Sequence, residues 1–453
     1  MSSHSITLDD LPRDGERLDL AKVSKFNGAL LITGIIGLGV SVLYMTGILG
    51  AQRQAEFAYS WLFAFFFFFT ISNGGIFWTM LQHLSNSGWS VTVRRLFENL
   101  GANVKWMALF ALPFLLIPAI QDSLWEWMTI HKEAAHHAAE HGQTTRDALH
   151  HMSESNPHLH VLVGKFGYLN ITAWYVRAII YFVFLGGMIT ILRKWSIQQD
   201  KDGNFKHTFN SRAICAFPLL IYALAVTFSA VDWIMSMDFT WFSTMWGVYI
   251  FAGGAWGGMA MSILALTYVR SQGYLKKTVS MEHYHLMGKL LMAFTIFWGY
   301  IAFSQFFLIW YANITEETRF FLLRNTEGWW HLSNILVWGH FVITFIVLLS
   351  AGRKKVPDTM NWVCVWVLLM HVVDYYWLIM PERGPSLTSG DNALRLGYHG
   401  DPMLWLPGAW LGDVVAFVGI GGICGWAYLR RLGKASLYPC RDPRLLESVV
   451  AIN

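Results

Sequence analysis

The residues best placed to do chemistry are ionisable side chains inside long apolar runs. His371 and Asp374 are three positions apart in VCVWVLLMHVVDYYWLIM, so on a helix they share a face. A carboxylate beside an imidazole can hold a proton and pass it on, because each group changes the other's proton affinity or fixes its tautomer. The pair is therefore predicted to belong to a proton path, or to a site that takes protons from a reduced quinone. The alternative is a buried pair that only orients the helices.

Further charged residues lie inside apolar runs, where an unpaired charge is expensive. Arg177 must find an anion, and Asp122 and Asp232 are candidates at similar depth on neighbouring runs. Such a contact is either a structural ion pair or part of a functional site. Asp413 stands in GAWLGDVVAFVGIGG, whose small residues permit close approach of helices. It is predicted to be either a proton relay or an interhelical hydrogen-bonding group.

His340 lies near the middle of another apolar run. Together with His371 it could in principle hold a haem, since bis-histidine ligation needs two helices that face one cavity. A lone histidine at this depth is more often part of hydrogen-bonded packing, so no haem is predicted. His283 and His285 are two positions apart and do not share a helix face, which argues against a metal site. Glu282 could pass protons toward Lys289, or the segment could simply begin a juxtamembrane helix. The remaining polar candidates are Asp238 and Gln305.

These side chains require elements that can cross a lipid bilayer. Of the 453 residues, 55% are hydrophobic and 14% are charged, against about 25% charged in an ordinary soluble domain. So little polar surface cannot cover a soluble core, which means that lipid must be the solvent. Each span needs about twenty apolar residues and must be helical to satisfy its backbone. Runs of this length lie at 27–50, 57–80, 104–127, 168–193, 213–235, 244–269, 287–311, 330–350, 361–380 and 407–430.

The predicted fold class is therefore an all-α, polytopic integral membrane protein with about ten transmembrane helices. Lys and Arg are concentrated in the loops of one side, which by the positive-inside rule places both termini in the cytoplasm. The predicted division is a cytoplasmic tail at 1–26, a transmembrane domain at 27–430 and a second cytoplasmic tail at 431–453. The first tail lacks the apolar core of a signal peptide, so the first run is predicted to remain in the mature protein.

Two outer loops, at 122–167 and 381–406, are the largest segments between the runs. The first reads as polar helix, EAAHHAAEHGQTTRDALHHM, and its irregular histidine spacing favours a solvated face or a partner contact over a metal site. The four cysteines are scattered without a CxxC, so neither an iron–sulfur cluster nor a structural zinc is predicted. The net charge of +4 is spread over short loops, which argues against nucleic-acid binding. No catalytic residue is predicted.

Three strings of the sequence resemble a known family. SMDFTWFSTMWGVYIFAGG (236–254), EHYHLMGKLLMAFTIFWGYIAFSQFFLIWYANITEET (282–318) and HVVDYYWLIMPE (371–382) resemble the ActF subunit of bacterial alternative complex III, a quinol-oxidising respiratory complex. The likeness covers essentially all ten runs. Members of this NrfD/PsrC-like group usually carry Pro-His after the Ser-Met-Asp, where this chain has Phe239 and Thr240. A role for a histidine at that place is therefore not carried over.

The resemblance implies two four-helix bundles, made of helices 2–5 and 6–9, with two peripheral helices. It also implies a multi-pass protein of the bacterial inner membrane. The implied partners are membrane lipids, an ActC-like paralogue, an iron–sulfur subunit and multihaem cytochrome c subunits, with a terminal oxidase as a further candidate. Haem c and iron–sulfur clusters would lie in those partners, and a quinone such as menaquinone is the ligand that this chain could take. The candidates in matching strings are Asp238, Glu282, His283, His285, Lys289, Gln305, His371 and Asp374.

Residues and resemblance together predict an integral membrane subunit of a quinol:cytochrome c or quinol:oxidase oxidoreductase. The chain would not be catalytic alone, and its contribution would be a scaffold and a proton relay. Two alternatives stay open. A stand-alone proton-coupled transporter would suit the buried Asp and His residues, although broken helices in matching halves are not evident. A purely structural membrane anchor is the other.

Overall fold

The computed structural model describes residues 11, 12, 14–325, 328–383 and 409–451, and every regular element among them is a helix. Within these described ranges, ten helices or series of helices are long and apolar enough to cross a membrane, which indicates a multi-pass membrane protein. They are α1 (Ser24–Met45), α2 (Ala51–Leu84), α3 to α5 (Val91–Gly101, Val104–Phe110 and Leu112–Leu116), α10 (Ile171–Asp202), α12 (Pro218–Trp233), α13 (Trp246–Ser271), α14 (Met281–Ala312), α16 and α17 (Trp329–Ile335 and Thr344–Leu349) with a π-helix between them (Leu336–Ile343), α19 (Pro357–Ile379) and α20 (Ala409–Lys434).

Shorter helices connect the spans or lie at their ends. They are α6 (Pro118–Leu124), α7 (Glu126–His141), α8 (Thr145–Ser155), α9 (Leu159–Lys165), α11 (Lys206–Ala216), α15 (Thr315–Arg324), α18 (Ala351–Lys354) and α21 (Leu445–Val449). The polar helix that the sequence predicts within 122–167 is therefore present, as α7 and α8. The predicted loop at 381–406 lies almost entirely outside the described residues.

The third span differs from the prediction. It occupies Val91–Leu116, and the predicted run at 104–127 is wrong at both ends. Ile117 leaves the helical conformation, with φ −101° and ψ 106°, because a residue before proline is pushed out of the α region. The segment at 91–103 is not recognised as part of a span by its hydropathy, because VTVRRLFENLG carries charged residues. These charged residues are buried in the folded chain.

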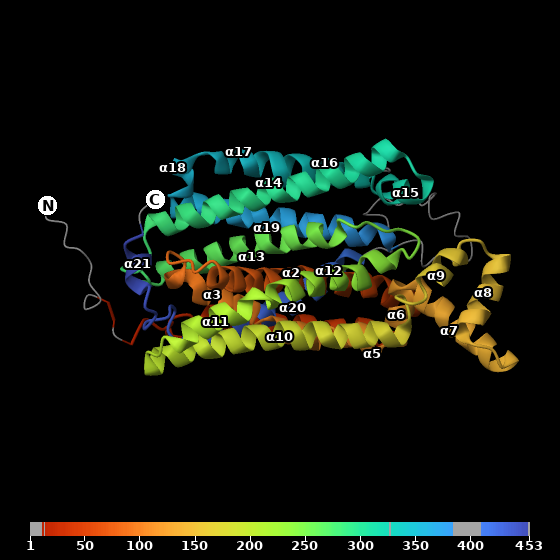
Figure 1. The fold of residues 1–453 in the computed structure, drawn as a ribbon, viewed down its shortest axis with the longest axis horizontal. Coiled ribbons are helices and arrows are strands. Elements are labelled where there is room, and N and C mark those ends of the chain that lie inside the picture. The colour runs from red at the N-terminus through yellow and green to blue at the C-terminus, as the bar shows by residue number, and fades with distance from the viewer. Residues whose placement is uncertain (1–10, 13, 326–327, 384–408, 452–453) are drawn as a thin grey trace.

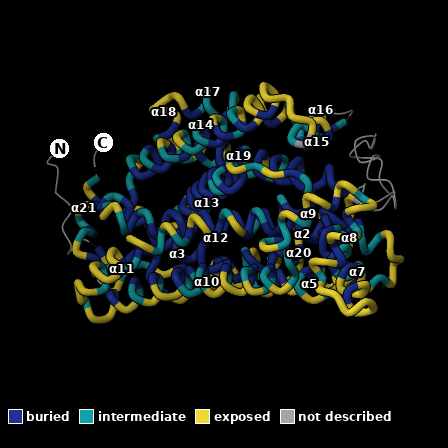
Figure 2. Tube along the Cα trace, turned by 45° about the vertical axis from the view of Figure 1, so that its right-hand side comes forward, coloured by how far each residue is buried: buried dark blue, intermediate teal, exposed yellow. Residues whose placement is uncertain are grey.

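Helix α2 lies at the centre of the bundle. It packs on α3, α13, α19 and α20 and is almost wholly buried, including most of the phenylalanines in FAFFFFFT at 63–70. Helix α1, by contrast, packs mainly on α20 and leaves most of its surface exposed. The long helices lie side by side along the long axis of the molecule (Figure 1). Buried residues fill the middle of the bundle, and exposed residues follow its outward faces (Figure 2).

The two ends of the bundle are built differently. At one end α7, α8 and α9 form an outer subdomain (126–165) that projects beyond the long helices (Figure 1). At the other end lie α18, α21 and the described parts of both terminal segments. There the backbone N–H of Leu437 donates to the carbonyl oxygen of Glu16 at 2.6 Å. The segments before α1 and after α20 are thus joined at one end of the molecule.

Candidate functional site

The candidate site lies where α2, α13 and α19 meet. Helix α13 carries two glycine pairs in AGGAWGGMA, and their missing side chains let both neighbours approach closely. A Cβ on Gly254 would lie 2.9 Å from the carbonyl oxygen of Thr70 on α2. A Cβ on Gly257 would lie 3.0 Å from Nε2 of His371 on α19. The glycines therefore bring polar groups of three helices into contact.

Asp374 is fully buried on α19, and its two carboxylate oxygens have different surroundings. Oδ1 accepts a hydrogen bond from the hydroxyl of Tyr249 on α13. The indole of Trp298 is a further hydrogen-bonding neighbour of the carboxylate, and Oδ2 has no partner of ordinary hydrogen-bond geometry among the residues that the structure describes. Nearly all buried polar atoms in proteins are paired, so this oxygen retains the capacity to bind a proton or a polar ligand. The hydroxyl of Tyr375 is likewise buried and unpartnered within the described ranges.

His371 is also fully buried, and its ring faces α2 and α13. Its Nε2 lies 3.4 Å from the hydroxyl of Thr70, whereas Nδ1 has no hydrogen-bond partner in the described part of the chain. The ring of Tyr375 packs edge-on against the imidazole with centroids 4.6 Å apart. The predicted pair of His371 and Asp374 is thus buried in one place, but each member bonds to a different helix and not to the other.

His340 lies between two indole rings. Its imidazole stacks on Trp256 and on Trp298, with centroid distances of 3.9 Å and 3.6 Å. Both ring nitrogens are buried, and no described residue supplies them with a hydrogen-bond partner. The histidine belongs to the π-helix Leu336–Ile343, a geometry that is frequent at functional sites. Because Trp256 also packs against His371, with centroids 6.4 Å apart, the two imidazoles do not face each other across an open, haem-sized gap.

Aromatic side chains connect these titratable groups. Trp298 packs against Tyr249 with ring centroids 5.6 Å apart, and Tyr249 donates its hydroxyl to Asp374. The contacts join residues of α2, α13, α14, the π-helix and α19 into one buried assembly. This assembly is called the core cluster below, and it consists of Thr70, Tyr249, Trp256, Trp298, His340, His371, Asp374 and Tyr375.

Arg177 and Asp232 form an ion pair at some distance along the bundle, between α10 and α12. The guanidinium donates to both carboxylate oxygens, from Nε and Nη2, each at 2.8 Å. Tyr181 donates to the same carboxylate at 2.6 Å. Of the two anions predicted for Arg177, the structure selects Asp232, whereas Asp122 contacts Lys132. Every strong hydrogen-bonding atom of the Asp232 carboxylate is occupied, which indicates a structural pair.

Asp413 on α20 is bound by two partners. Nη2 of Arg383 donates to it at 2.9 Å, and the hydroxyl of Ser60 on α2 donates at 2.5 Å. The aspartate thereby links α20 to α2, as expected for an interhelical hydrogen bond. Its other predicted role, as a proton relay, stays a prediction.

Two predicted residues lie toward the end that carries the outer subdomain. Asp238 forms an ion pair with Arg319, whose Nε is 3.5 Å from the carboxylate. Together with Arg324 and Glu382, Asp238 lines a small cavity of about 10 Å³. Gln305 on α14 is buried, and its amide nitrogen has no hydrogen-bond partner in the described ranges. Neither residue contacts a member of the core cluster through a hydrogen bond shown by the described structure.

The predicted residues at the start of α14 divide into separate contacts. Glu282 forms ion pairs with Lys355 and with His285, whose Nδ1 is 3.3 Å away. His283 caps the first turn of α14 and lies 2.9 Å from a threonine hydroxyl of α3. Lys289 is exposed. The structure therefore holds Glu282 at the helix start and does not direct it toward Lys289.

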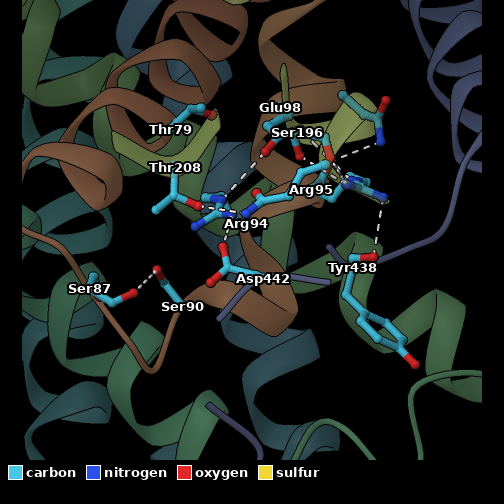
Figure 3. A network of polar contacts seen from close by, with 12 residues as sticks. Thr79, Ser87, Ser90, Arg94, Arg95, Glu98, Ser196, Thr208, Tyr438 and Asp442 are labelled. Carbon is cyan, nitrogen blue, oxygen red and sulfur yellow. Dashed lines mark hydrogen bonds and ion pairs between the residues drawn. The ribbon is translucent and has the colours of Figure 1, made fainter. Parts of the chain in front are cut away.

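A buried charged network on α3 was missed by the sequence reasoning (Figure 3). Arg94 contacts Asp442 at 2.7 Å, and Arg95 contacts Asp200 at 2.5 Å. Glu98 lies 3.5 Å and 3.9 Å from the Nε atoms of the two arginines. All five residues lie near the end of the bundle where the terminal segments meet. The available signal was VTVRRLFENLG itself, a strongly amphipathic stretch that directly follows the second span.

No protein-family model matches this chain, and no curated protein matches it.

Proposed function

We propose that the chain is an integral membrane subunit of a quinol-oxidising respiratory complex in the inner membrane of a bacterium. The complex would be of the quinol:cytochrome c or quinol:oxidase type. Haem c and iron–sulfur clusters would lie in partner subunits, and a quinone would be the diffusible reactant. This chain would act as a scaffold, and its core cluster would relay protons.

One observation carries the relay: titratable side chains with unused hydrogen-bonding atoms lie together in the core. Among the described residues, Oδ2 of Asp374, Nδ1 of His371 and both ring nitrogens of His340 lack a partner. A buried polar group without a partner costs about 1–3 kcal/mol. Ionisable residues kept inside a membrane usually serve transport or proton transfer. A carboxyl, an imidazole and a phenol with free positions can accept a proton at one atom and release it at another.

Further unpartnered groups extend along α2 from the core cluster toward the charged network of α3. They are the side-chain amides of Asn73 and Gln82 and Nε2 of His83, for which the described chain offers no hydrogen-bond partner. Asn73 is less than one turn from Thr70, which contacts His371. The proposed route therefore follows α2 between the core cluster and Glu98.

We also propose that both termini are cytoplasmic and that spans 2–5 and 6–9 form two four-helix bundles with spans 1 and 10 outside them. The packing of α2 on α3 and of α13 on α14 and α19 supports this division, and α1 packs mainly on α20. Close packing of α2 on α13 would then join the bundles. The positive-inside bias supports a cytoplasmic location for the end that carries α18 and α21.

The first experiment tests membership of a complex. The tagged chain is purified from its native membrane, and its partners are identified by mass spectrometry and by haem and iron–sulfur spectra. The proposal expects stable copurification with a multihaem cytochrome and an iron–sulfur protein. Isolation of a lone chain that moves protons or solutes in liposomes would instead establish a transporter.

The second experiment tests the relay and separates it from a purely structural anchor. Asp374→Asn removes the ionisable carboxyl but keeps the size and the Tyr249 hydrogen bond. We expect proton-coupled quinol turnover of the assembled complex to fall about a hundredfold or more, in the range of lost acid–base catalysis, with assembly unchanged. The matched control is Asp358→Asn, an exposed acid on the same helix, which should leave turnover unchanged. Full turnover in Asp374→Asn would favour the anchor.

A further inference from the structure

We propose that the hollow between α7 and α8 in the outer subdomain is a binding site for a divalent transition-metal ion, with Zn²⁺ as the best fit. The two helices fold back on each other after Gly142, which ends α7 with a positive φ of 64°. Between them lies a cavity of about 390 Å³. Its lining consists of His137, His141, Gln143, Ala148, His151 and Met152.

Three ligands come from the last turns of α7, two of them from the lining of the hollow and the third, Glu140, from beside it. His137, Glu140 and His141 are spaced i, i+3 and i+4, so they share a helix face. Their ligand atoms already lie within 4.8 Å of one another. A zinc ion with bonds of about 2.0–2.2 Å requires these atoms to approach by roughly one ångström more. All three side chains are exposed, so this adjustment needs only rotation about side-chain bonds.

The orientation of His141 favours metal binding at its outer nitrogen. Its Nδ1 lies 2.9 Å from the backbone carbonyl oxygen of His137. A carbonyl can only accept a hydrogen bond, so Nδ1 carries the proton and Nε2 presents its lone pair. Metal-bound histidines are commonly held by this kind of hydrogen bond from the other ring nitrogen.

A fourth ligand would come from the opposite helix, by a side-chain rotation that brings it to the three atoms of α7, since it is not among the atoms that lie within 4.8 Å of one another. His151 on α8 lines the same hollow, whereas its neighbour His150 does not. Three imidazoles and one carboxylate form a donor set that suits Zn²⁺ or Cu²⁺ better than Ca²⁺ or Mg²⁺, which prefer oxygen alone. The spacing looks irregular in the sequence because the ligands lie on two helices that meet only in the fold. This is why the sequence argued against a metal here.

The test uses the full-length protein in detergent, stripped of metal with a chelator, and titrated with ZnCl₂ by calorimetry. We expect one ion per chain, and affinity reduced on the order of tenfold or more in His137→Ala, His141→Ala and His151→Ala, as for lost metal-site interactions. His150→Ala and His160→Ala are the matched controls, since each removes an exposed histidine of the outer subdomain that does not line the hollow. Both should bind zinc like the unchanged protein.

Two further readings decide between a built site and a diffuse histidine tract. Hydrogen exchange of α7 and α8 should slow when zinc is added to the unchanged protein, and the slowing should be absent in His137→Ala. If the control variants lost as much affinity for zinc as the three variants of proposed ligands, the proposal would be overturned. Binding of several ions per chain with no change in exchange would overturn it as well.

Discussion

Two buried acids of this protein, Asp232 and Asp374, lie within membrane spans, and both are completely hidden. The carboxylate of Asp232 accepts hydrogen bonds from Arg177 and Tyr181 on both oxygens. The carboxylate of Asp374 accepts one from Tyr249, and its second oxygen has no partner in the described ranges. The two sites contain similar residues, so residue type and depth do not separate structure from chemistry. The two sites are distinguished by their unused hydrogen-bonding capacity, which only the Asp374 carboxylate retains.

The largest expected effect is a loss of stability when the ion pair of Arg177 and Asp232 is broken. Asp232→Ala removes the anion and leaves the guanidinium of Arg177 partly buried without its partner. We expect the free energy of unfolding to fall by about 3 kcal/mol or more, because breaking a buried ion pair strands the other charge. Thermal unfolding in detergent, followed by tryptophan fluorescence, measures the loss.

The double variant Arg177→Met with Asp232→Leu supplies the control, since it removes both charges and restores apolar contact. It should recover most of the lost stability. If Asp232→Ala unfolded at the same temperature as the unchanged protein, the ion pair would not be structural, and the contrast drawn between Asp232 and Asp374 would be wrong.

A smaller effect of opposite sign is expected in the core cluster. His340→Phe keeps a flat ring between Trp256 and Trp298 and removes two nitrogens that lack partners. We expect the free energy of unfolding to rise by about 1 kcal/mol, because an unsatisfied buried polar group is costly. A loss of stability in the same unfolding assay would mean that the imidazole nitrogens have a structural partner, and would remove His340 from the relay.

The smallest effect concerns pH and the outer subdomain. His131 is buried beside Trp127 and Phe166, and burial lowers the pKa of His131 below its ordinary value of 6.5. The folded form therefore holds the neutral ring. Its contribution to stability is present above about pH 6.5 and is lost as the pH falls through the lowered folded pKa. The protection factors of amides in α7 and α9, which are corrected for the intrinsic pH dependence of exchange, should fall below pH 6.5, and His131→Phe should remove most of that fall.

Hydropathy predicts most of the architecture, because a bilayer imposes a minimum length and a helical backbone on every span. It misplaces the third span because the charges of α3 are neutralised by Asp200 and Asp442, which lie far away in the chain. It also does not reveal that α2 is the buried centre and α1 a peripheral helix. Both are apolar enough to cross a bilayer, and the packing partners decide which one is buried.

The structure buries in one place the two residues that the sequence sets three positions apart, and their role stays a prediction. His371 and Asp374 are recognisable because a polar pair in an apolar helix is expensive. Their partners Thr70 and Tyr249 are ordinary residues on other helices, so no local pattern marks them. His340 was recognised as a polar residue at mid-depth, but its enclosure by two indoles depends on long-range contacts.

The charged network of α3 has a consequence for how the chain is made. Arg94 and Arg95 enter the membrane early in synthesis, but Asp442 and the carbonyl of Tyr438, which they contact, follow the last span. Until the C-terminal segment has been made, Arg94 has only Glu98 of this network as an anion. The C-terminal segment thus supplies the last polar contacts of the charged network on α3. A chain truncated after α20 should be recognised by membrane quality control and degraded.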